Sequence, residues 1–162
     1  MNHTDVKYTQ ANSHLREVFP FLHRTARGRL IVPNGLVVTP DHNMRGNLGE
    51  ALLLCGVAPI FAASIADASY HLATSPVSFV LCEHHLTDGA YTDLLSLSRA
   101  AAMPPPFVVI STTGDWPDYF EAIDRGAYDF LSYPLIPGEL QRIVTAYLKL
   151  NFDVTPQGCR LD

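Results

Sequence analysis

The chain has 162 residues, which is enough for one domain with a sizeable hydrophobic core. Hydrophobic residues make up 48% of it and charged residues 17%, a composition that excludes a largely disordered protein. Sixteen acidic residues against eleven basic ones give a net charge of −5, so no surface that binds nucleic-acid phosphates is expected.

The cysteines give a prediction about the compartment. Cys55, Cys82 and Cys159 show no paired spacing, and two of them fall within predicted buried elements. They are therefore expected to be reduced thiols, as in a cytoplasmic protein. Because no stretch resembles a signal peptide or reaches the length of a membrane span, we predict a cytoplasmic protein with no membrane partner.

Residues 1–33 are predicted to form an N-terminal extension that is partly helical. Apolar residues between 15 and 22 recur at helical spacing, but Pro20 interrupts them. Two short helices and one kinked helix fit this pattern equally well. We expect the extension to pack on the domain, and the alternative is an arm that forms oligomers.

From residue 34 onward, short apolar runs alternate with amphipathic stretches. The runs predict five strands, at residues 35–40, 57–61, 77–83, 107–111 and 128–131. The amphipathic stretches predict five helices, at about residues 44–55, 65–72, 91–98, 116–125 and 137–147. Residues 151–162 are expected to form a C-terminal tail.

Local signals define several ends and faces of these elements. Asp41 or Asn43 is placed to cap the first of these helices, and Gly56 to end it in the left-handed conformation. Asp115 is placed to cap the fourth helix and Gly126 to end it. An apolar stripe of that helix is expected on one face and consists of Tyr119, Phe120 and Ile123.

The strand order follows from one proline. Pro59 cannot donate to a strand ladder, so the second strand is expected at an edge of the sheet. The alternation of strands and helices with short connections requires right-handed parallel crossovers, with helices on both faces. Residues 34–150 are therefore predicted to form an α/β domain with a flavodoxin-like, doubly wound, five-stranded parallel sheet of order 2-1-3-4-5.

An abrupt change of polarity marks the end of the third predicted strand. The apolar run ends at Glu83, and the polar loop HHLTDG follows. Such a run is typical of a strand that is buried on both faces and meets solvent at its carboxyl end. Because ligands of open α/β sheets bind at such ends, Glu83 is the first candidate functional residue.

Three segments, in order and at these intervals, resemble the receiver domain of two-component response regulators. FVLCEHHLTDG at 79–89 resembles the strand that ends in the phospho-acceptor aspartate. VVISTTGD at 108–115 resembles the strand with the conserved Thr or Ser, and RGAYDFLSYP at 125–134 resembles the signature Gly-Ala-x-Asp-Tyr/Phe-Leu-x-Lys-Pro. The resemblance covers about residues 35–150, and it implies a cis peptide bond between Tyr133 and Pro134.

The resemblance also assigns the positions that perform phosphorylation, and most of them have changed. Only the switch residues keep their chemical type. The matching positions are Glu83 for the phospho-acceptor aspartate, Thr39 and Pro40 for the acidic pair that holds Mg²⁺, Tyr133 for the active-site lysine, Ser111 for the Thr/Ser switch and Phe130 for the switching aromatic.

These departures predict a degenerate receiver, a pseudo-receiver without phosphorylation chemistry. Pro40 supplies no side-chain ligand to a metal ion, and Asp41, one residue late, is expected to cap a helix instead. The carboxylate of Glu83 lies one methylene farther out than that of an aspartate, and in-line transfer is sensitive to such displacement. Without Mg²⁺ and the lysine, nothing preorganised stabilises the transferring phosphoryl group. We therefore expect no enzyme activity, no metal and no cofactor.

Other interpretations of the site stay open. The chain could be an active, unorthodox receiver phosphorylated at Glu83 or elsewhere, or a small-ligand sensor that uses the same pocket. Glu83 could mimic a phosphoryl group and act on Ser111 and Phe130, or it could form a simple hydrogen bond to Ser111, Thr112 or Tyr133, which is the preferred interpretation. Hydrolase chemistry at Ser111 is not expected, because no glycine-flanked nucleophile elbow surrounds it.

The histidines give no metal-binding pattern. His84 and His85 are adjacent and close to Asp88, but they lack the spacing of a ligand set, so solvated loop side chains are expected. His42 and His71 are predicted to lie on helix surfaces.

The expected role is protein–protein contact. In receivers, the face formed by the fourth helix, fifth strand and fifth helix is a common contact surface, and Asp129 and Arg142 match positions that pair between subunits in one large subfamily. The predicted partner is a histidine kinase, another regulator or a second copy in a homodimer. The possible interface residues are Tyr119, Tyr128, Asp129, Arg142 and Tyr147.

Overall fold

The computed structural model describes residues 23–24 and 30–151. The expected helix between residues 15 and 22, the C-terminal tail and Cys159 lie outside the described residues. The first described elements are two short strands, β1 (His23–Arg24) and β2 (Leu30–Ile31), which pair in antiparallel fashion within the predicted extension.

The central feature is a parallel sheet of five strands. The strands are β3 (Asn34–Val38), β4 (Ala58–Ala62), β5 (Phe79–Glu83), β8 (Phe107–Ser111) and β9 (Asp129–Ser132). They lie in the order β4-β3-β5-β8-β9, which confirms the predicted order 2-1-3-4-5. Two further short strands, β6 (His85–Leu86) and β7 (Gly89–Ala90), form a hairpin directly after β5.

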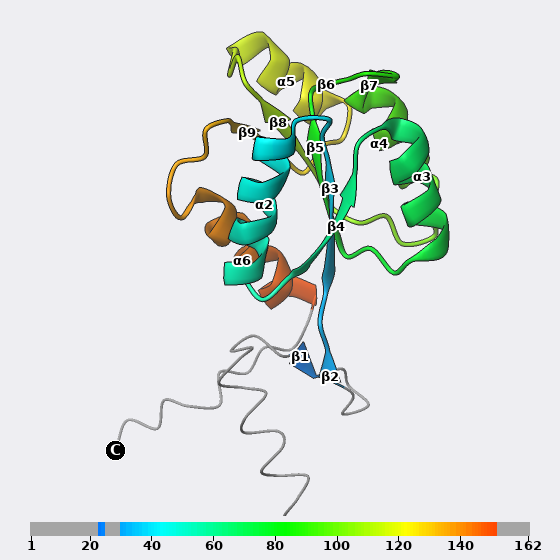
Figure 1. Ribbon diagram of the computed structural model, residues 1–162, viewed down its shortest axis with the longest axis vertical. Coiled ribbons are helices and arrows are strands. Elements are labelled where there is room, and N and C mark those ends of the chain that lie inside the picture. The colour runs from blue at the N-terminus through cyan, green and yellow to red at the C-terminus, as the bar shows by residue number, and fades with distance from the viewer. Residues whose placement is uncertain (1–22, 25–29, 152–162) are drawn as a thin grey trace, which may run out of the picture.

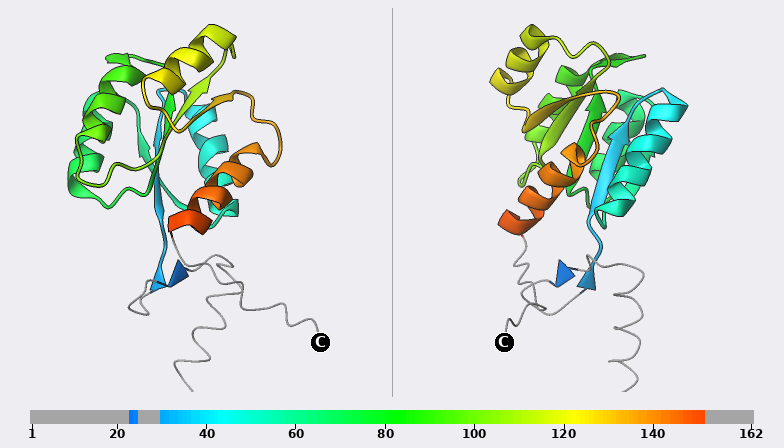
Figure 2. Two further views of the ribbon diagram at one scale, coloured as in Figure 1. Left: turned by 180° about the vertical axis from the view of Figure 1, so that it is seen from behind. Right: turned by 90° about the vertical axis from the view of Figure 1, so that its left-hand side faces the viewer.

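Five helices cover both faces of this sheet (Figures 1 and 2). They are α2 (His42–Leu54), α3 (Ile65–Thr74), α4 (Tyr91–Arg99), α5 (Trp116–Asp124) and α6 (Glu139–Asn151). α2 and α6 lie on one face, whereas α3, α4 and α5 lie on the other. None of the described helices is both long and apolar enough to cross a membrane.

Two hydrophobic layers hold the helices to the sheet. Successive side chains of a strand point to opposite faces, so Val37 packs under α2 and α6 while Leu36 and Val38 pack under α3 and α4. The strands β5 and β8 are buried on both faces, as their unbroken apolar runs predict. One side of α6 completes the first layer, where Leu140, Ile143 and Val144 are buried.

The element ends confirm most of the local signals. The Asp41 carboxylate accepts a hydrogen bond from the Met44 N–H at 2.9 Å and so caps α2. Gly56 and Gly126 follow their helices with φ angles of 75° and 100°, in the left-handed region. Asp115 is the N-cap residue of α5, as predicted, and its carbonyl accepts from the Tyr119 N–H at 3.2 Å, but its side chain makes no cap bond. The peptide bond between Tyr133 and Pro134 is cis, as predicted.

Pro59 lies in the edge strand β4, at a position where its missing N–H costs no ladder bond. The Ala58 N–H donates to Pro33, and the Ala62 carbonyl accepts from Thr39, so these two residues turn their backbone groups toward β3. Hydrogen-bonding directions alternate along a strand, which turns the backbone of Pro59 and Phe61 to the outer side. The proline therefore marks the open edge of the sheet.

The predicted apolar face of α5 needs correction. Ala122 is the buried residue of this helix, and Tyr119 is partly buried against Phe130, with ring centroids 6.0 Å apart in a T-shaped arrangement. Phe120 follows Tyr119 by one position, which is a rotation of about 100° around an α-helix, and its ring is exposed. Ile123 is exposed as well, so the fully buried Ala122, and not the predicted stripe, marks the side of α5 that is turned to the sheet.

Candidate functional site

The candidate site lies where neighbouring strands end at the carboxyl edge of the sheet. Glu83 ends β5, Ser111 ends β8, Thr39 directly follows β3, and Tyr133 directly follows β9. Because β3, β5, β8 and β9 are consecutive neighbours in the sheet, the fold brings these four positions to one edge.

The main contact at this edge joins Thr39 and Glu83. The Thr39 hydroxyl, which is fully buried, donates to the Glu83 Oε2 atom at 2.5 Å. The same hydroxyl accepts from the Asp41 N–H at 3.0 Å. Glu83 thus forms its hydrogen bond with Thr39, and not with the predicted partners Ser111, Thr112 and Tyr133. The reason is local: Thr39 directly follows β3, the strand next to β5, and its hydroxyl is a donor within reach of Glu83.

Ser111 is buried and belongs to a turn of its own. Its hydroxyl oxygen accepts from the backbone N–H groups of Thr113 and Gly114 at 3.2 and 3.3 Å, and it lies 3.0 Å from the Thr113 hydroxyl. This geometry closes the start of the β8–α5 loop on Ser111. Phe130, the other predicted switch residue, is buried beneath Tyr119.

Tyr133, at the lysine position of the resemblance, reaches across the edge to α2. Its hydroxyl accepts from the Asn47 side-chain amide at 2.6 Å. The ring itself packs against the hydrophobic layer under α2 and α6. A neutral phenol thus occupies this position and ties β9 to α2.

Sequence reasoning missed one cation close to the site. The Arg45 guanidinium donates to the Thr39 carbonyl at 3.0 Å, so a positive charge lies next to the loop after β3. Its position four residues after the cap Asp41 was the available signal, because residues i and i+4 share a helix face. A positive charge is therefore present at this edge of the sheet. It belongs to Arg45 on α2, and its guanidinium is bound to a backbone carbonyl.

Nothing in the described part of the chain indicates a metal site. Pro40 and Asp41 are exposed, and the Asp41 carboxylate is engaged as the cap of α2. No group of three or more His, Cys, Asp or Glu side chains is arranged to hold a metal ion among the described residues. The Asp88 carboxylate accepts from the Ile65 and Ala66 N–H groups at the start of α3. It is therefore engaged with that helix and not with the neighbouring histidines.

The prediction that His84 is a solvated loop residue is wrong. Its side chain is 15% exposed, its ring centroid lies 5.0 Å from that of Tyr91, and its Nδ1 lies 3.0 Å from His85 Nε2. Its Nε2 atom is buried without a hydrogen-bond partner among the described residues, 4.0 Å from Asp118 Oδ1. Burial lowers the pKa of His84 and His85 lowers it further, while Asp118 and Glu121 oppose this shift. His42 is exposed as predicted, whereas His71 is half-buried.

This environment predicts a pH-dependent stability. A lowered pKa in the native state means that the unfolded chain binds the proton more readily, so the free energy of unfolding should fall as the pH drops below about 6.5. Replacing His84→Gln should make the difference in stability between about pH 7.5 and pH 5.5 smaller, as measured by urea denaturation. His42→Gln, on an exposed histidine, is the matched control. An unchanged pH profile in His84→Gln would contradict the assignment.

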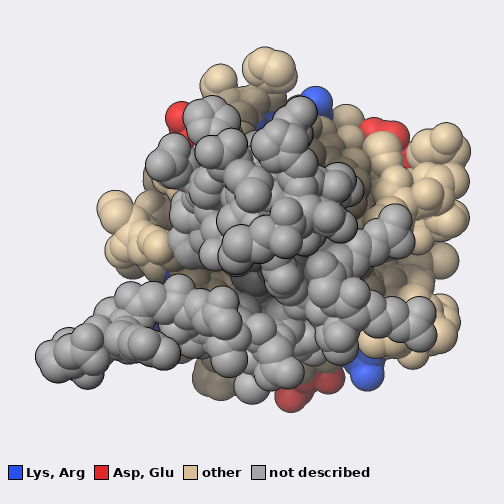
Figure 3. Space-filling view, turned by 90° about the horizontal axis from the view of Figure 1, so that it is seen from below, with Lys and Arg blue, Asp and Glu red and all other residues tan. Residues whose placement is uncertain are grey.

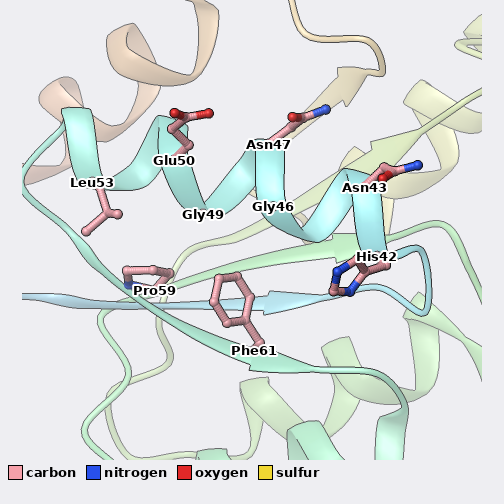
Figure 4. Close-up of a pocket in the computed structure, with 9 residues that line it drawn as sticks. All are labelled: His42, Asn43, Gly46, Asn47, Gly49, Glu50, Leu53, Pro59 and Phe61. Atoms are coloured by element: carbon pink, nitrogen blue, oxygen red, sulfur yellow. The ribbon is translucent and has the colours of Figure 1, made fainter.

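A wide groove between α2 and the edge strand β4 lies away from Glu83. Its volume is about 670 Å³. Figure 4 shows Pro59 and Phe61 beneath the helix, whereas Asn47 and Glu50 point away from the strand. Gly49 permits the close approach, because a Cβ atom there would lie 2.6 Å from the Phe61 ring. This groove gives no support to the predicted small-ligand pocket at Glu83.

The possible interface residues come from three neighbouring elements. Tyr119 lies on α5, Tyr128 and Asp129 at the start of β9, and Arg142 and Tyr147 on α6. Tyr128 and Tyr147 contact each other with ring centroids 6.5 Å apart, and Arg142 is exposed. Tyr128 and Tyr147 thus lie side by side, whereas α5, with Tyr119, lies on the other face of the sheet from α6.

The charges show no large basic surface in the face that Figure 3 displays. Where that view from below is not covered by grey atoms, single acidic and basic side chains lie apart at its rim.

Comparisons with known proteins agree on the fold. No family model matches the sequence. Over 90 residues, 56% of the chain, it is 29% identical to the response regulator protein PilR of Pseudomonas aeruginosa, of which the match covers 20%. Over 107 residues, 66% of the chain, it is 30% identical to the swarming motility regulation protein RssB of Serratia marcescens, of which the match covers 49%.

A solved structure extends this agreement to most of the described residues. The receiver domain of the Francisella response regulator 1452 matches with a TM-score of 0.66 and 19% identity, over 73% of this chain and 98% of that one. The chain spans half or less of the length of the two curated relatives. The described part of the chain therefore has the fold of a CheY-like response regulator receiver domain.

Proposed function

We propose that the chain acts in two-component signalling as a receiver domain that is not phosphorylated and works by protein–protein contact. The observation that carries this proposal is the hydrogen bond between Thr39 and Glu83. The residue at the position of a metal-binding acid binds the residue at the position of the phospho-acceptor. Each of the two side chains thus has its hydrogen-bond partner within the protein.

The chemistry of phosphoryl transfer supports this interpretation. Transfer to a carboxylate depends on a correctly placed oxygen and on cations that stabilise the developing charge. One Glu83 oxygen is engaged by Thr39, Pro40 offers no side-chain ligand, and Tyr133 is neutral. Arg45, the cation nearby, donates to a backbone carbonyl. The edge therefore lacks the preorganised charge that the reaction requires.

The names of the relatives support signalling as the context. Both similar proteins are described as regulators, and the fold is that of receiver domains. In this proposal, the partner is a histidine kinase, another regulator or a second copy, and contact is made through the surface of α5, β9 and α6. Glu83 then has a structural role, because its partner is Thr39 and the hydroxyl of Ser111 is held in the adjacent turn.

Intact-mass spectrometry tests the proposal. The protein is incubated with Mg²⁺ and acetyl phosphate, and no phosphoryl adduct is expected, because the metal cage and the lysine are absent. An active receiver domain treated in parallel shows that the donor and the conditions support phosphorylation. An adduct on the wild type that is absent from Glu83→Ala would contradict the proposal and favour the active, unorthodox receiver. An adduct that Glu83→Ala retains would place phosphorylation elsewhere on the chain and would contradict it as well.

A further inference from the structure

The helix α5 presents aromatic rings to solvent. Trp116 is 73% exposed and Phe120 is 61% exposed, and their ring centroids lie 6.3 Å apart. Tyr119 contacts both rings, at centroid distances of 6.0 and 5.5 Å. We call Trp116, Tyr119, Phe120 and Ile123 the α5 aromatic surface. Contiguous exposed apolar side chains of this kind are typical of interaction sites, whereas single ones are ordinary.

The fold explains why these rings stay outside. α5 meets the sheet through Ala122, which is fully buried, and through the inner side of Tyr119. Trp116 and Phe120 lie on the outward half of the same helix, where no described residue covers them. Aromatic side chains contribute strongly to binding when a partner buries them, because they bring a large area at a small cost in conformational entropy.

Acidic residues are frequent in and next to α5. Asp115, Asp118, Glu121 and Asp124 all belong to α5 or its first flanking residue, against one cation, Arg125. Glu121 pairs with Arg125 at 2.8 Å, and Asp115 makes no side-chain cap bond. Asp118 lies 4.0 Å from His84, so the Asp115 and Asp124 carboxylates remain exposed at the two ends of the helix. The helix is therefore aromatic and negatively charged at once.

We propose that the α5 aromatic surface docks a cationic amphipathic segment of a partner protein. Arg or Lys side chains of that segment stack on Trp116 and Phe120 and pair with the flanking carboxylates, while its apolar residues cover the rings. This inference rests on the proposed function and specifies the chemistry of the partner. A second copy fits poorly, because a symmetric contact between two α5 helices brings like charges together.

The single tryptophan of the chain allows a direct test. A display library of random helical peptides is selected on the 162-residue protein. Selected peptides are expected to be rich in Arg or Lys and in Leu or aromatic residues. Their binding is followed by the shift and the quenching of Trp116 fluorescence, since a partner on this surface covers the indole.

Variants and salt define the expected result. Phe120→Ser should weaken binding at least about tenfold, and Asp124→Lys should weaken it severalfold. Binding should also weaken as ionic strength rises, because exposed charges are screened. Tyr70→Ser, on an aromatic side chain of α3 that is 64% exposed, is the matched control and should leave the affinity unchanged. Circular dichroism confirms that each variant is folded.

Several outcomes would overturn the inference. These are failure to enrich any peptide, enrichment of acidic or neutral peptides, and equal binding to Phe120→Ser. A concentration-dependent change in Trp116 fluorescence without peptide would show a second copy as the occupant and would overturn it too. A phosphoryl adduct in the mass measurement bears on the proposed function alone, so the two proposals can fail separately.

Discussion

Replacing Thr39 by valine is expected to lower the free energy of unfolding by about 2 kcal/mol, since hydrogen bonds to charged groups contribute about 1.5–3 kcal/mol. Valine keeps the shape of the buried side chain but removes the hydroxyl that donates to Glu83 and accepts from the Asp41 N–H. Both of those groups then lose a partner at the edge of the sheet. Urea denaturation at neutral pH measures the change, because the midpoint shifts while the slope stays the same.

A double-mutant cycle identifies the partner of Thr39. Glu83→Gln keeps the size of the side chain but removes its charge, and the double variant Thr39→Val/Glu83→Gln completes the cycle. A coupling energy of about 1 kcal/mol is expected for two side chains in direct contact. Additive effects of the two substitutions would contradict the hydrogen bond between the Thr39 hydroxyl and the Glu83 carboxylate on which the proposed function rests. Ser111→Ala combined with Glu83→Gln is the control pair, and it should be additive.

Two substitutions of Tyr91 are expected to change the free energy of unfolding in different directions: Tyr91→Ala should lower it strongly, whereas Tyr91→Phe should leave it unchanged or raise it. The ring is 2% exposed at the start of α4, and its hydroxyl oxygen is buried without a hydrogen-bond partner among the described residues. Tyr91→Ala should cost about 3–5 kcal/mol, because a large cavity forms in the layer under α3 and α4. Tyr91→Phe removes only the unpaired hydroxyl, so it should leave the stability unchanged or raise it by about 1 kcal/mol.

Thermal and urea unfolding of both variants distinguish these effects. A loss of more than about 1 kcal/mol in Tyr91→Phe would show that the hydroxyl does make a stabilising bond. Leu94→Ala, one turn along the same helix and also buried, gives a reference for the cost of a cavity in this layer. The ratio of the Phe and Ala effects at position 91 therefore separates ring packing from the polar atom.

The sequence was sufficient for the fold because each level of the pattern agreed. Unbroken apolar runs predicted β5 and β8 as doubly buried strands, and Pro59 predicted the edge position of β4, which together led to the strand order. The caps at Asp41 and Gly56 are local features, so short segments of sequence define them. Strand and helix ends differ from the predictions by only a few residues.

Side-chain partners at the site were harder to predict, because they depend on distances between strands. The resemblance drew attention to Ser111 and Tyr133, but the register of β3 and β5 brings Thr39 closest to Glu83. Asn47 belongs to α2, and only the packing of that helix reveals its bond to Tyr133. The burial of His84 likewise depends on Tyr91 and α5, which follow it in the chain.

The outward face of α5 was also beyond the sequence pattern. Three apolar residues in a short helix indicate that they form the buried face. A helix that packs on the sheet through one small residue can instead turn those apolar residues toward solvent. In α5 the residue buried against the sheet is Ala122, so the rings of Trp116 and Phe120 are exposed to solvent. Tyr119, which the sequence analysis named as a possible interface residue, lies at the inner border of that surface.

The proline in β4 has a consequence for how this protein behaves when it is concentrated. An open strand edge is where chains extend one another's sheets into fibrils, and an incoming strand needs regularly spaced donors along that edge. Pro59, the second residue of β4, lacks one of those donors on the outer side of the strand. Exchange of this proline for valine is therefore expected to complete the template and to promote amyloid-like aggregation of the concentrated protein.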